Sequence, residues 1–325
     1  MPQIAISTIE AKSRAALERH GAAPAQAVDL ARAVAWAEAR GNRICGLYYL
    51  ESYCQQLTSG RVDGRAEPEV TRPRPGTVRV DARFGFAQTA FARALPEALA
   101  AARECGTAVL AVSHAHTCTA LGYFTEQAAQ AGVLCFGATN ASPIVAPPGG
   151  KRRVIGTNPV AFAVPDGAGG LAMSFDQSTT AVALGKITMA KAAGEKIPMG
   201  WALDAEGKPT TDPEAALAGS LASAGGYKGW GFGLMAELLA AAMTGSTLSQ
   251  DVKPLKAPEG APHDLGQFYI LIDPGTEPTF FERLARLAEA VMADGAGRIP
   301  GQRKAVMDVV DVPEALVAQL EALAG

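Results

Sequence analysis

The sequence lacks the two glycine-rich patterns that most often hold nucleotide phosphates. Neither Gly-x-Gly-x-x-Gly after a strand nor Gly-x4-Gly-Lys-Ser/Thr occurs among the 325 residues. A standard Rossmann half is therefore poorly supported. A glycine-dense segment at residues 225–231 would open a helix and expose amides and Lys228 to an anion. A flexible turn with a solvated lysine explains the same residues equally simply.

Three further absences narrow the class of protein. The five cysteines are odd in number and include no Cys-x-x-Cys pair, which suits reduced thiols in a cytoplasm better than secreted disulfides. The 29 basic and 32 acidic residues are scattered, so nucleic acid is not expected as a partner. Charges interrupt the N-terminal segment, and no other segment is long and apolar enough to cross a membrane. We therefore expect a cytoplasmic protein without a membrane partner.

The apolar pattern predicts a mixed α/β chain. With 48% hydrophobic residues, the chain can form one large or two modest domains. Apolar residues at helical spacing predict three short helices between residues 8 and 57. Buried strands at 107–112 and 133–138 flank a helix at 124–131, as in an α/β layer. Further helices are expected at 91–104, 213–222, 234–243 and 280–293, and further strands at 77–80 and 268–273.

Two histidines and a cysteine follow the strand predicted at 107–112. His114, His116 and Cys118 are spaced by two, which would place all three on one face of an extended backbone. Acid–base catalysis is the favoured interpretation, because histidine titrates near neutral pH. A transition-metal site needs more converging ligands, and His20 and His263 lie in segments without ligand-like character. Polar side chains hydrogen-bonded at a strand end are the third explanation.

Polar turns between residues 140 and 180 could surround a ligand. Asp176 begins a hydroxyl-rich turn, where its carboxylate could accept ribose hydroxyls or simply cap a helix. Asn140 and the Gly156-Thr157-Asn158-Pro159 turn could arrange backbone and side-chain amides around a ligand, although such turns are common.

Short blocks spread over nearly the whole chain occur in a specific order. They include Leu57-Thr-Ser-Gly-Arg-Val62, Gly85-Phe-Ala-Gln88, Asn140-Ala-Ser-Pro143, Gly156-Thr-Asn-Pro159, Gly226-Tyr-Lys-Gly229 and Ile299-Pro-Gly-Gln302. In this order they resemble the malate/L-lactate dehydrogenase family of nicotinamide-dependent oxidoreductases. That family includes ureidoglycolate dehydrogenase, 2,3-diketogulonate reductase and Δ1-piperideine-2-carboxylate/Δ1-pyrroline-2-carboxylate reductase.

The resemblance implies a fold, a coenzyme and a reaction. The fold is α/β, with a non-Rossmann mixed-sheet domain for the nicotinamide at residues 122–264. A second α/β domain, for substrate and dimerisation, is formed by both chain ends, residues 1–121 and 265–325, as in sulfolactate dehydrogenase. The resemblance also implies NADH or NADPH, a homodimer, and reduction of a small 2-keto or cyclic 2-imino carboxylic acid. The reverse reaction would be that of a 2-hydroxy acid dehydrogenase or an imino-acid-forming dehydrogenase.

The resemblance assigns roles to individual residues as well, and none of them is a metal ligand. His116 is expected to supply the proton with His114 in support, and Cys45 takes the place of a family histidine. The residues expected at the substrate are Arg43, Tyr49, Tyr53 and Thr157. Those expected at the coenzyme are Asn140, Thr157, Asn158, Asp176, Ser178, Thr179, Lys228, Gly301 and Gln302.

The chain departs from the family near its N-terminus. Members typically read Ser-His-Gly with an arginine four residues after the histidine, whereas this chain has Ile44-Cys45-Gly46 and Tyr49. Thr117 stands where members carry the second residue of a histidine pair. A thiol is a weaker donor than imidazole, and a neutral ring cannot replace a bidentate guanidinium.

These departures leave three interpretations. In the first, the substrate differs from that of the family, and Arg43 or another cation binds its carboxylate. Alternatively, the chain has lost ordinary activity and acts as a ligand-binding protein. A metal-dependent hydrolase built on the residues after the strand at 107–112 is the remaining alternative.

Overall fold

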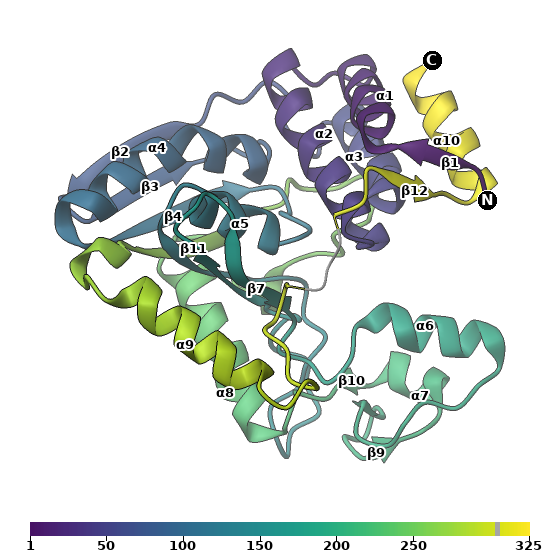
Figure 1. Cartoon of the computed structure of the whole chain (residues 1–325). Helices are drawn as coiled ribbons and strands as arrows, with labels where there is room; N and C mark the ends of the chain where they lie inside the picture. The colour runs from purple at the N-terminus through teal and green to yellow at the C-terminus, as the bar shows by residue number, and fades with distance from the viewer. Residues whose placement is uncertain (303–305) are drawn as a thin grey trace.

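Helices from both ends of the chain pack together in the computed structural model, which describes residues 1–302 and 306–325. The N-terminal helices are α1 (Ile6–Arg19), α2 (Pro24–Ala39) and α3 (Leu47–Ser59), with the 3-10 turn η1 (Arg43–Cys45) before α3. The C-terminal helix α10 (Glu314–Ala324) packs against α1, and β1 (Gln3–Ala5) pairs antiparallel with β12 (Val309–Asp311). Figure 1 shows the two termini side by side, around a shared apolar core.

A seven-stranded mixed sheet forms the centre of the molecule (Figure 1). In order across the sheet, the strands are β2 (Glu69–Arg74), β3 (Thr77–Asp81), β4 (Thr107–Ala115), β11 (Leu265–Ile272), β5 (Leu134–Thr139), β6 (Val160–Pro165) and β7 (Leu171–Gln177). Only β3 and β4 run parallel, and every other neighbouring pair is antiparallel. This order differs from the doubly wound Rossmann arrangement and confirms the predicted non-Rossmann α/β class.

Helices cover both faces of the sheet. On one face, α4 (Ala87–Cys105) and α5 (Gly122–Gln130) contact β4, β5 and β6. On the other, α8 (Tyr227–Glu237) and the π-helical turn η2 (Leu238–Ala242) contact β5 and β11. A glycine permits this close packing, because a Cβ on Gly266 would lie 1.6 Å from the carbonyl oxygen of Ala240.

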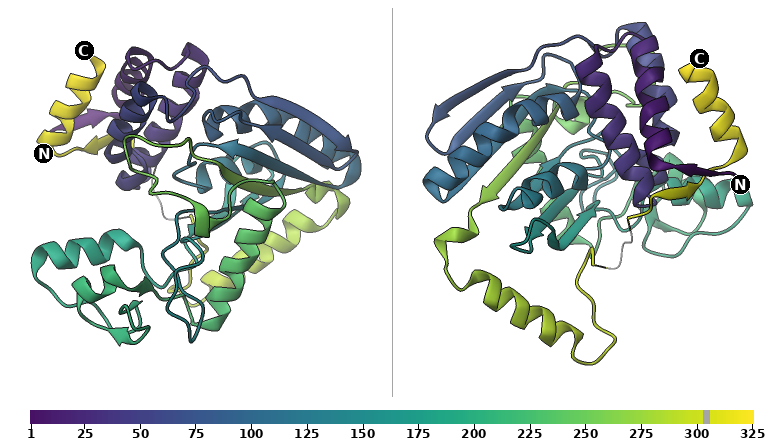
Figure 2. Two further views of the ribbon diagram at one scale, coloured as in Figure 1. Left: turned by 180° about the vertical axis from the view of Figure 1, so that it is seen from behind. Right: turned by 45° about the horizontal axis from the view of Figure 1, so that its top comes forward.

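A small lobe is inserted between β7 and α8 (Figure 2). It contains α6 (Leu184–Ala193), α7 (Pro213–Ala218) and a three-stranded sheet in the order β10 (Ser220–Leu221), β8 (Ala202–Leu203) and β9 (Pro209–Thr210). The turns η3 (Ser249–Asp251) and η4 (Pro274–Thr276) flank β11 in the chain, and α9 (Phe280–Met292) follows. In the right-hand view of Figure 2, α9 stands clear of the other helices.

The structure corrects one expected helix. The helix expected at 213–222 ends at Ala218, because residues 220 and 221 form β10. Gly219 makes the change of direction possible, since a Cβ there would lie 2.0 Å from the carbonyl oxygen of Leu203. None of the described helices is long and apolar enough to cross a membrane.

The central sheet takes strands from both of the domains expected from the resemblance. Strand β11 lies between β4 and β5 although it follows them by more than a hundred residues. The sheet therefore continues across the boundaries at residues 121 and 265. The division into a substrate domain and a nicotinamide-binding domain stays a prediction about function.

Candidate active site

The two histidines after residue 112 have different surroundings. Strand β4 carries one extra residue relative to β11 between Val112 and Ala115, and His114 in this bulge has a φ of 50°. The bulge breaks the alternation on which the expectation of one shared face depended. The His114 side chain stays one-third exposed, at 34%, and its Nδ1 lies 2.8 Å from Asp264 Oδ1. His116 is completely buried.

His116 stacks on a second histidine. Its ring centroid lies 4.0 Å from that of His263, with 7° between the planes. Its Nε2 lies 2.7 Å from Gln56 Oε1. Because the Gln56 amide nitrogen donates to Leu255 and Ser52, the Gln56 oxygen is the acceptor and His116 Nε2 carries the hydrogen.

Both stacked rings are neutral near pH 7. Burial, and then the nearby His263, lowers the pKa of His116 well below its usual range. Burial lowers the pKa of His263 to about 3, with Arg61 as the next cause. His116 therefore meets a potential substrate as an uncharged imidazole.

The end of α3 holds the loop that leads to His263. Arg61 is buried at 2% exposure and donates to the carbonyls of Pro254 and Ala261, both at 3.0 Å. The Ser59 hydroxyl donates to the carbonyl of Pro258 at 2.6 Å. The Leu-Thr-Ser-Gly-Arg-Val block thus positions residues 254–263 beside His116.

The predicted residues at the start of α3 join this group. Cys45 ends η1, Tyr49 follows in α3, and the ring centroids of Tyr49 and Tyr53 are 4.8 Å apart. The Tyr53 ring lies 5.6 Å from that of His116, and its hydroxyl donates to Thr119 Oγ1 at 3.2 Å. The structure therefore brings Cys45, Tyr49, Tyr53 and His116 into one cluster.

Asp176, Lys256 and Arg61 are charged residues that act on this cluster. Burial raises the pKa of the Cys45 thiol to about 12, and the Asp176 carboxylate raises it further, while Lys256 lowers it. Burial also raises the pKa of Tyr49. The Lys256 ammonium lies 5.2 Å from the centroid of the Tyr49 ring. A neutral thiol and a neutral phenol thus lie near charged side chains of both signs.

Arg43, the cation expected at the substrate, faces the protein. Burial raises the pKa of Glu38, and the Arg43 charge offsets part of that effect. Glu38 Oε1 also accepts from the amide of Leu47 at 2.8 Å. Gly46 makes this contact possible, because a Cβ there would lie 2.3 Å from Glu38 Oε1.

One group of predicted coenzyme residues lies near the start of α8. The Thr179 amide and hydroxyl donate to the carbonyl of Thr157 at 3.0 and 2.9 Å. Ser178 and Thr180 share a hydrogen bond of 2.9 Å. Asn158 is buried, with its amide 2.7 Å from Glu237 Oε2. The exposed Lys228 lies in the first turn of α8.

A second group lies beside β7. Gln302 donates to the carbonyl of Ala172 at 3.2 Å. A cavity of about 320 Å³ there is lined by Arg40, Glu126, Gln130, Leu171, Met173, Ser174, Gly301, Gln302 and Val306. Asn140 lies apart, where its amide donates to the carbonyl of Thr247 at 2.9 Å. Asp176 Oδ2 accepts a hydrogen bond from the amide of Gly122 at 2.8 Å. The Asp176 carboxylate is near enough to Cys45 to raise the pKa of its thiol.

Sequence reasoning missed Gln56, His263 and Lys256. Gln56 directly precedes the Leu57–Val62 block, and His263 precedes a buried strand much as His116 follows one. These positions are weak signals of a site residue in the sequence. Lys256 has no such signal apart from its charge. Within residues 1–302 and 306–325, no group of three or more His, Cys, Asp or Glu side chains could hold a metal ion.

Comparisons with known proteins cover the full length of the chain. The (2R)-3-sulfolactate dehydrogenase (NADP(+)) of Chromohalobacter salexigens is 39% identical, over 99% of this chain and 98% of the relative. A Δ1-pyrroline-2-carboxylate/Δ1-piperideine-2-carboxylate reductase of Pseudomonas putida is 38% identical, over 93% of this chain and 89% of the relative. The Δ1-piperideine-2-carboxylate reductase structure from Pseudomonas syringae has a TM-score of 0.91 at 32% identity, covering 99% of this chain and all of that one.

The family comparison agrees with these relatives. The family model described as malate/L-lactate dehydrogenase matches residues 4–310. The sulfolactate dehydrogenase structure from Methanocaldococcus jannaschii, at 28% identity, has a TM-score of 0.89 over 99% of this chain and 96% of that one. The predicted resemblance is therefore confirmed, and this chain belongs to the malate/L-lactate dehydrogenase family.

Proposed function

We propose that this protein is an NAD(P)H-dependent reductase of a small 2-keto or cyclic 2-imino carboxylic acid. The cluster of Cys45, Tyr49, Tyr53 and His116 carries the proposal, because it gathers four predicted site residues beside two charged groups. The names of the full-length relatives support it, since they describe a sulfolactate dehydrogenase and reductases of cyclic imino carboxylates. Both substrate types carry a carboxylate next to the reacting carbon.

The polar groups near α8 fit a nicotinamide coenzyme, which supplies the hydride when it is bound. We infer that Thr157, Ser178, Thr179 and Lys228 bind one part of it, since helix amides and an exposed ammonium suit phosphate. Gly301 and Gln302, beside the cavity at β7, contact another part. Asn140, Asn158 and Asp176 complete the proposed coenzyme-binding set.

His116 is the proposed proton donor. Burial lowers the pKa of His116, so its ring is neutral in the free protein. A negative charge nearby raises that pKa again, and the ring can then hold the proton that it donates. A substrate carboxylate, or the anion that develops during reduction, supplies such a charge. Proton delivery from Nε2 also requires that its contact with Gln56 opens. His114 is a positioning residue, because it bonds Asp264, the neighbour of the stacked His263.

A ligand-binding protein without turnover is the second candidate. Its support is the pair of departures at Cys45 and Tyr49, together with the burial of His116. In that case the same cluster would bind a small carboxylate and reduce nothing.

We also propose that the protein is located in the cytoplasm, because its five cysteines are unpaired.

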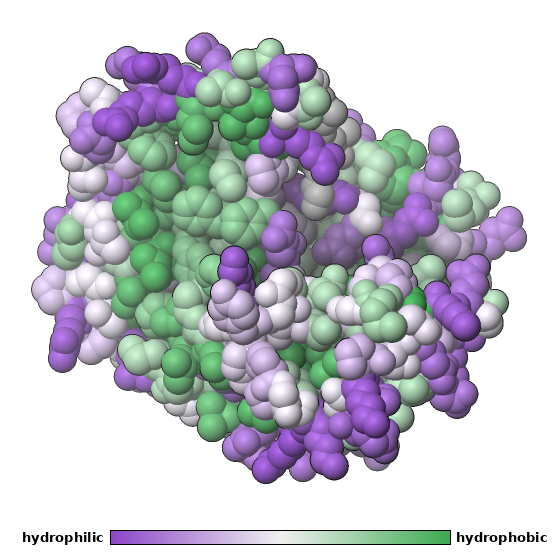
Figure 3. Space-filling view, turned by 90° about the horizontal axis from the view of Figure 1, so that it is seen from below, coloured by the Kyte–Doolittle hydropathy of each residue, from purple (hydrophilic) through white to green (hydrophobic). Residues whose placement is uncertain are grey.

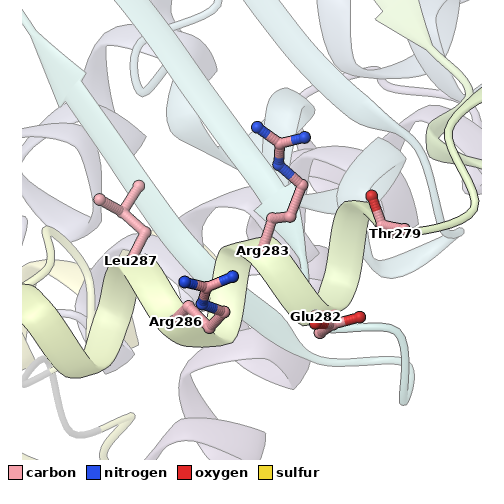
Figure 4. Close-up of a pocket in the computed structure, with 5 residues that line it drawn as sticks. All are labelled: Thr279, Glu282, Arg283, Arg286 and Leu287. Atoms are coloured by element: carbon pink, nitrogen blue, oxygen red, sulfur yellow. The ribbon is translucent and has the colours of Figure 1, made fainter.

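We further propose that the protein is a homodimer. Helix α9 contributes no buried residue, and its Leu287 is 61% exposed. Phe232 on α8 and Leu238 on η2 are also exposed, and Figure 3 shows a broad apolar area on the face of the molecule seen from below. A hollow of about 590 Å³ runs along α9 and is lined by its residues, among them Arg283 and Leu287. These two side chains extend from one side of the helix, and Glu282 extends from the other (Figure 4). A second copy of the chain would cover these apolar side chains.

The purified protein should consume NADH or NADPH when given a 2-keto or cyclic 2-imino carboxylic acid. The loss of coenzyme absorbance measures this reaction, and a thermal shift with each coenzyme measures binding separately. Coenzyme binding without turnover across pyruvate, oxaloacetate, ureidoglycolate and cyclic imino acids would favour the ligand-binding alternative. Bound metal in elemental analysis, together with no binding or consumption of either coenzyme, would favour the hydrolase instead.

Three substitutions should show how much each of His116, His114 and Cys45 contributes to kcat/KM. His116→Gln should lower kcat/KM by roughly 10²-fold or more, because it removes the titrating group but keeps hydrogen bonding. Coenzyme affinity should stay unchanged. His114→Gln should cost much less, and Cys45→Ser should be mild because both side chains are neutral donors. Near-total loss on Cys45→Ser with a silent His116→Gln would move the chemistry to the start of α3.

Stability should fall as the pH drops below about 6.5. An unfolded histidine takes up a proton below that pH, whereas folded His263 does so only at about 3. The unfolded state therefore binds more protons between these values, and stability that is fully present above pH 6.5 is lost on acidification. The slope reaches about 1.4 kcal/mol per pH unit for each histidine. Urea unfolding between pH 4.5 and 7.5 should show a smaller slope for His263→Gln than for the parent; equal slopes would contradict the buried neutral ring.

Disrupting the proposed interface should yield monomers. The double variant Leu238→Glu/Leu287→Glu places two charges among the exposed apolar side chains of η2 and α9. Sedimentation velocity should show a dimeric parent and a monomeric variant. The matched control is Met189→Glu, on α6, which is also exposed and should stay dimeric. A monomeric parent would disprove the dimer.

A further inference from the structure

The candidate site lacks an arginine where the family resemblance places one. Tyr49 holds that position, and its neutral ring cannot form an ion pair with a carboxylate. A carboxylate that leaves water for a partly buried site needs a cation or several donors in return. Arg43 and Lys256 are cations near the start of α3 in the described residues, whereas Arg61 donates to main-chain carbonyls of the loop at 254–261.

The surroundings of these two cations differ. Arg43 is half-buried and offsets the charge of Glu38, a buried carboxylate that also accepts from the Leu47 amide. Moving Arg43 to a ligand would remove one of the two interactions that favour the charged form of Glu38. Lys256 instead lies over the ring of Tyr49, and its charge reaches the Cys45 thiol. Lys256 is therefore the better placed of the two to bind an anion at the cluster.

The backbone on both sides of Lys256 is fixed by α3 and the turn after it. Gln56 donates to the carbonyl of Leu255 at 2.9 Å, and Arg61 donates to the carbonyl of Ala257. The same Gln56 side chain contacts His116. The backbone next to Lys256 and the ring of the proposed proton donor thus share Gln56 as a partner, which fixes the placement of the loop beside His116 before a ligand arrives.

A second observation points to a ligand at the same place. The Tyr49 hydroxyl is buried and has no hydrogen-bond partner in the part of the chain that the structure describes. A buried donor without an acceptor is uncommon, because it loses its bond to water and gains none in return. A ligand carboxylate at the ring edge that carries the hydroxyl would be such an acceptor, with the Lys256 ammonium over the face of the same ring.

We propose that Lys256 and the Tyr49 hydroxyl together bind the substrate carboxylate, in place of the arginine that the resemblance leads one to expect. The Lys256 ammonium lies 5.2 Å from the centroid of the ring whose hydroxyl lacks a partner, so the two groups can bind one carboxylate. The proposal concerns the carboxylate that 2-keto and cyclic 2-imino acids share.

This inference rests on the proposed function for the reaction, but binding alone can test it. Pyrrole-2-carboxylate is a planar, unreactive analogue of a cyclic imino acid, and pyrrole-2-carboxamide is its uncharged counterpart. Calorimetry with the full-length protein, with and without NADPH, compares both probes. Lys256→Met should weaken pyrrole-2-carboxylate binding by roughly 10- to 100-fold and leave carboxamide binding unchanged, as expected for loss of a charge-assisted bond.

Control variants separate this role from a general effect on charge or folding. Lys253→Met removes the same charge from an exposed position in the same loop and should bind like the parent. Because Arg43 acts on Glu38, Arg43→Met should change the affinities for the carboxylate and the carboxamide alike, whereas Lys256→Arg should retain most of the carboxylate affinity. Tyr49→Phe should weaken carboxylate binding by roughly 3- to 10-fold. With a turned-over imino acid, Lys256→Met should raise KM far more than it lowers kcat.

The outcomes distinguish the two proposals. A parent that binds pyrrole-2-carboxylate through Lys256 but reduces nothing would keep this inference and reject the reductase. Turnover by the parent with unchanged affinity and KM in Lys256→Met would reject this inference and keep the reductase. Failure of the parent to bind the carboxylate probe, or an equal loss in Lys253→Met, would also overturn the assignment of Lys256.

Discussion

The contact between the end of α3 and residues 254–263 is the interaction on which the candidate site depends. Arg61 is almost completely buried, and burial lowers its pKa. Its guanidinium compensates by donating to main-chain carbonyls of the loop, including those of Pro254, Leu255, Ala257 and Ala261. Those carbonyls belong to an irregular segment whose polar backbone would otherwise lack partners. The arginine thus stabilises the loop and joins the helical core formed by both chain ends to the central sheet.

This contact gives the site its unusual charge pattern. His116 and His263 are neutral because the loop closes over them, and Cys45 and Tyr49 are neutral because burial raises the pKa of each. The exposed Asp176 and Lys256, together with the buried Arg61, supply charges beside these neutral groups. Such charges make the site sensitive to the charge of its ligand, because unpaired ions are costly to bury.

The sequence predicts local structure well because local structure follows local periodicity. Apolar spacing located α1, α2 and α3, and two continuous apolar runs located β4 and β5. The order of the elements along the chain does not show that β11 lies between those strands. Its pairing joins residues that are more than a hundred positions apart in the sequence. The bulge at His114 was equally invisible, since it arises from the register between β4 and β11 rather than from β4 alone.

The difference between local patterns and long-range contacts also explains which site residues could be predicted from the sequence. His116 and Cys45 stand at positions that ordered blocks of sequence identify, and the structure brings them together with Tyr53. Gln56, Lys256 and His263 act through contacts that span long separations in the chain, 60 residues from Gln56 to His116 and 199 from Gln56 to Leu255. No pattern within one segment encodes such contacts.

The position of Gln56 shows how the site can change its chemistry without changing its fold. This one side chain contacts the proposed acid through its oxygen and the loop of the proposed cation through its nitrogen. Exchange of residue 49 alters what the cluster binds, but it leaves that amide and the Arg61 contacts untouched. The cation can therefore move from α3 to the loop at 254–261, since the loop is already fixed beside the cluster. Substrate choice is in this way separated from the packing that holds the acid in place.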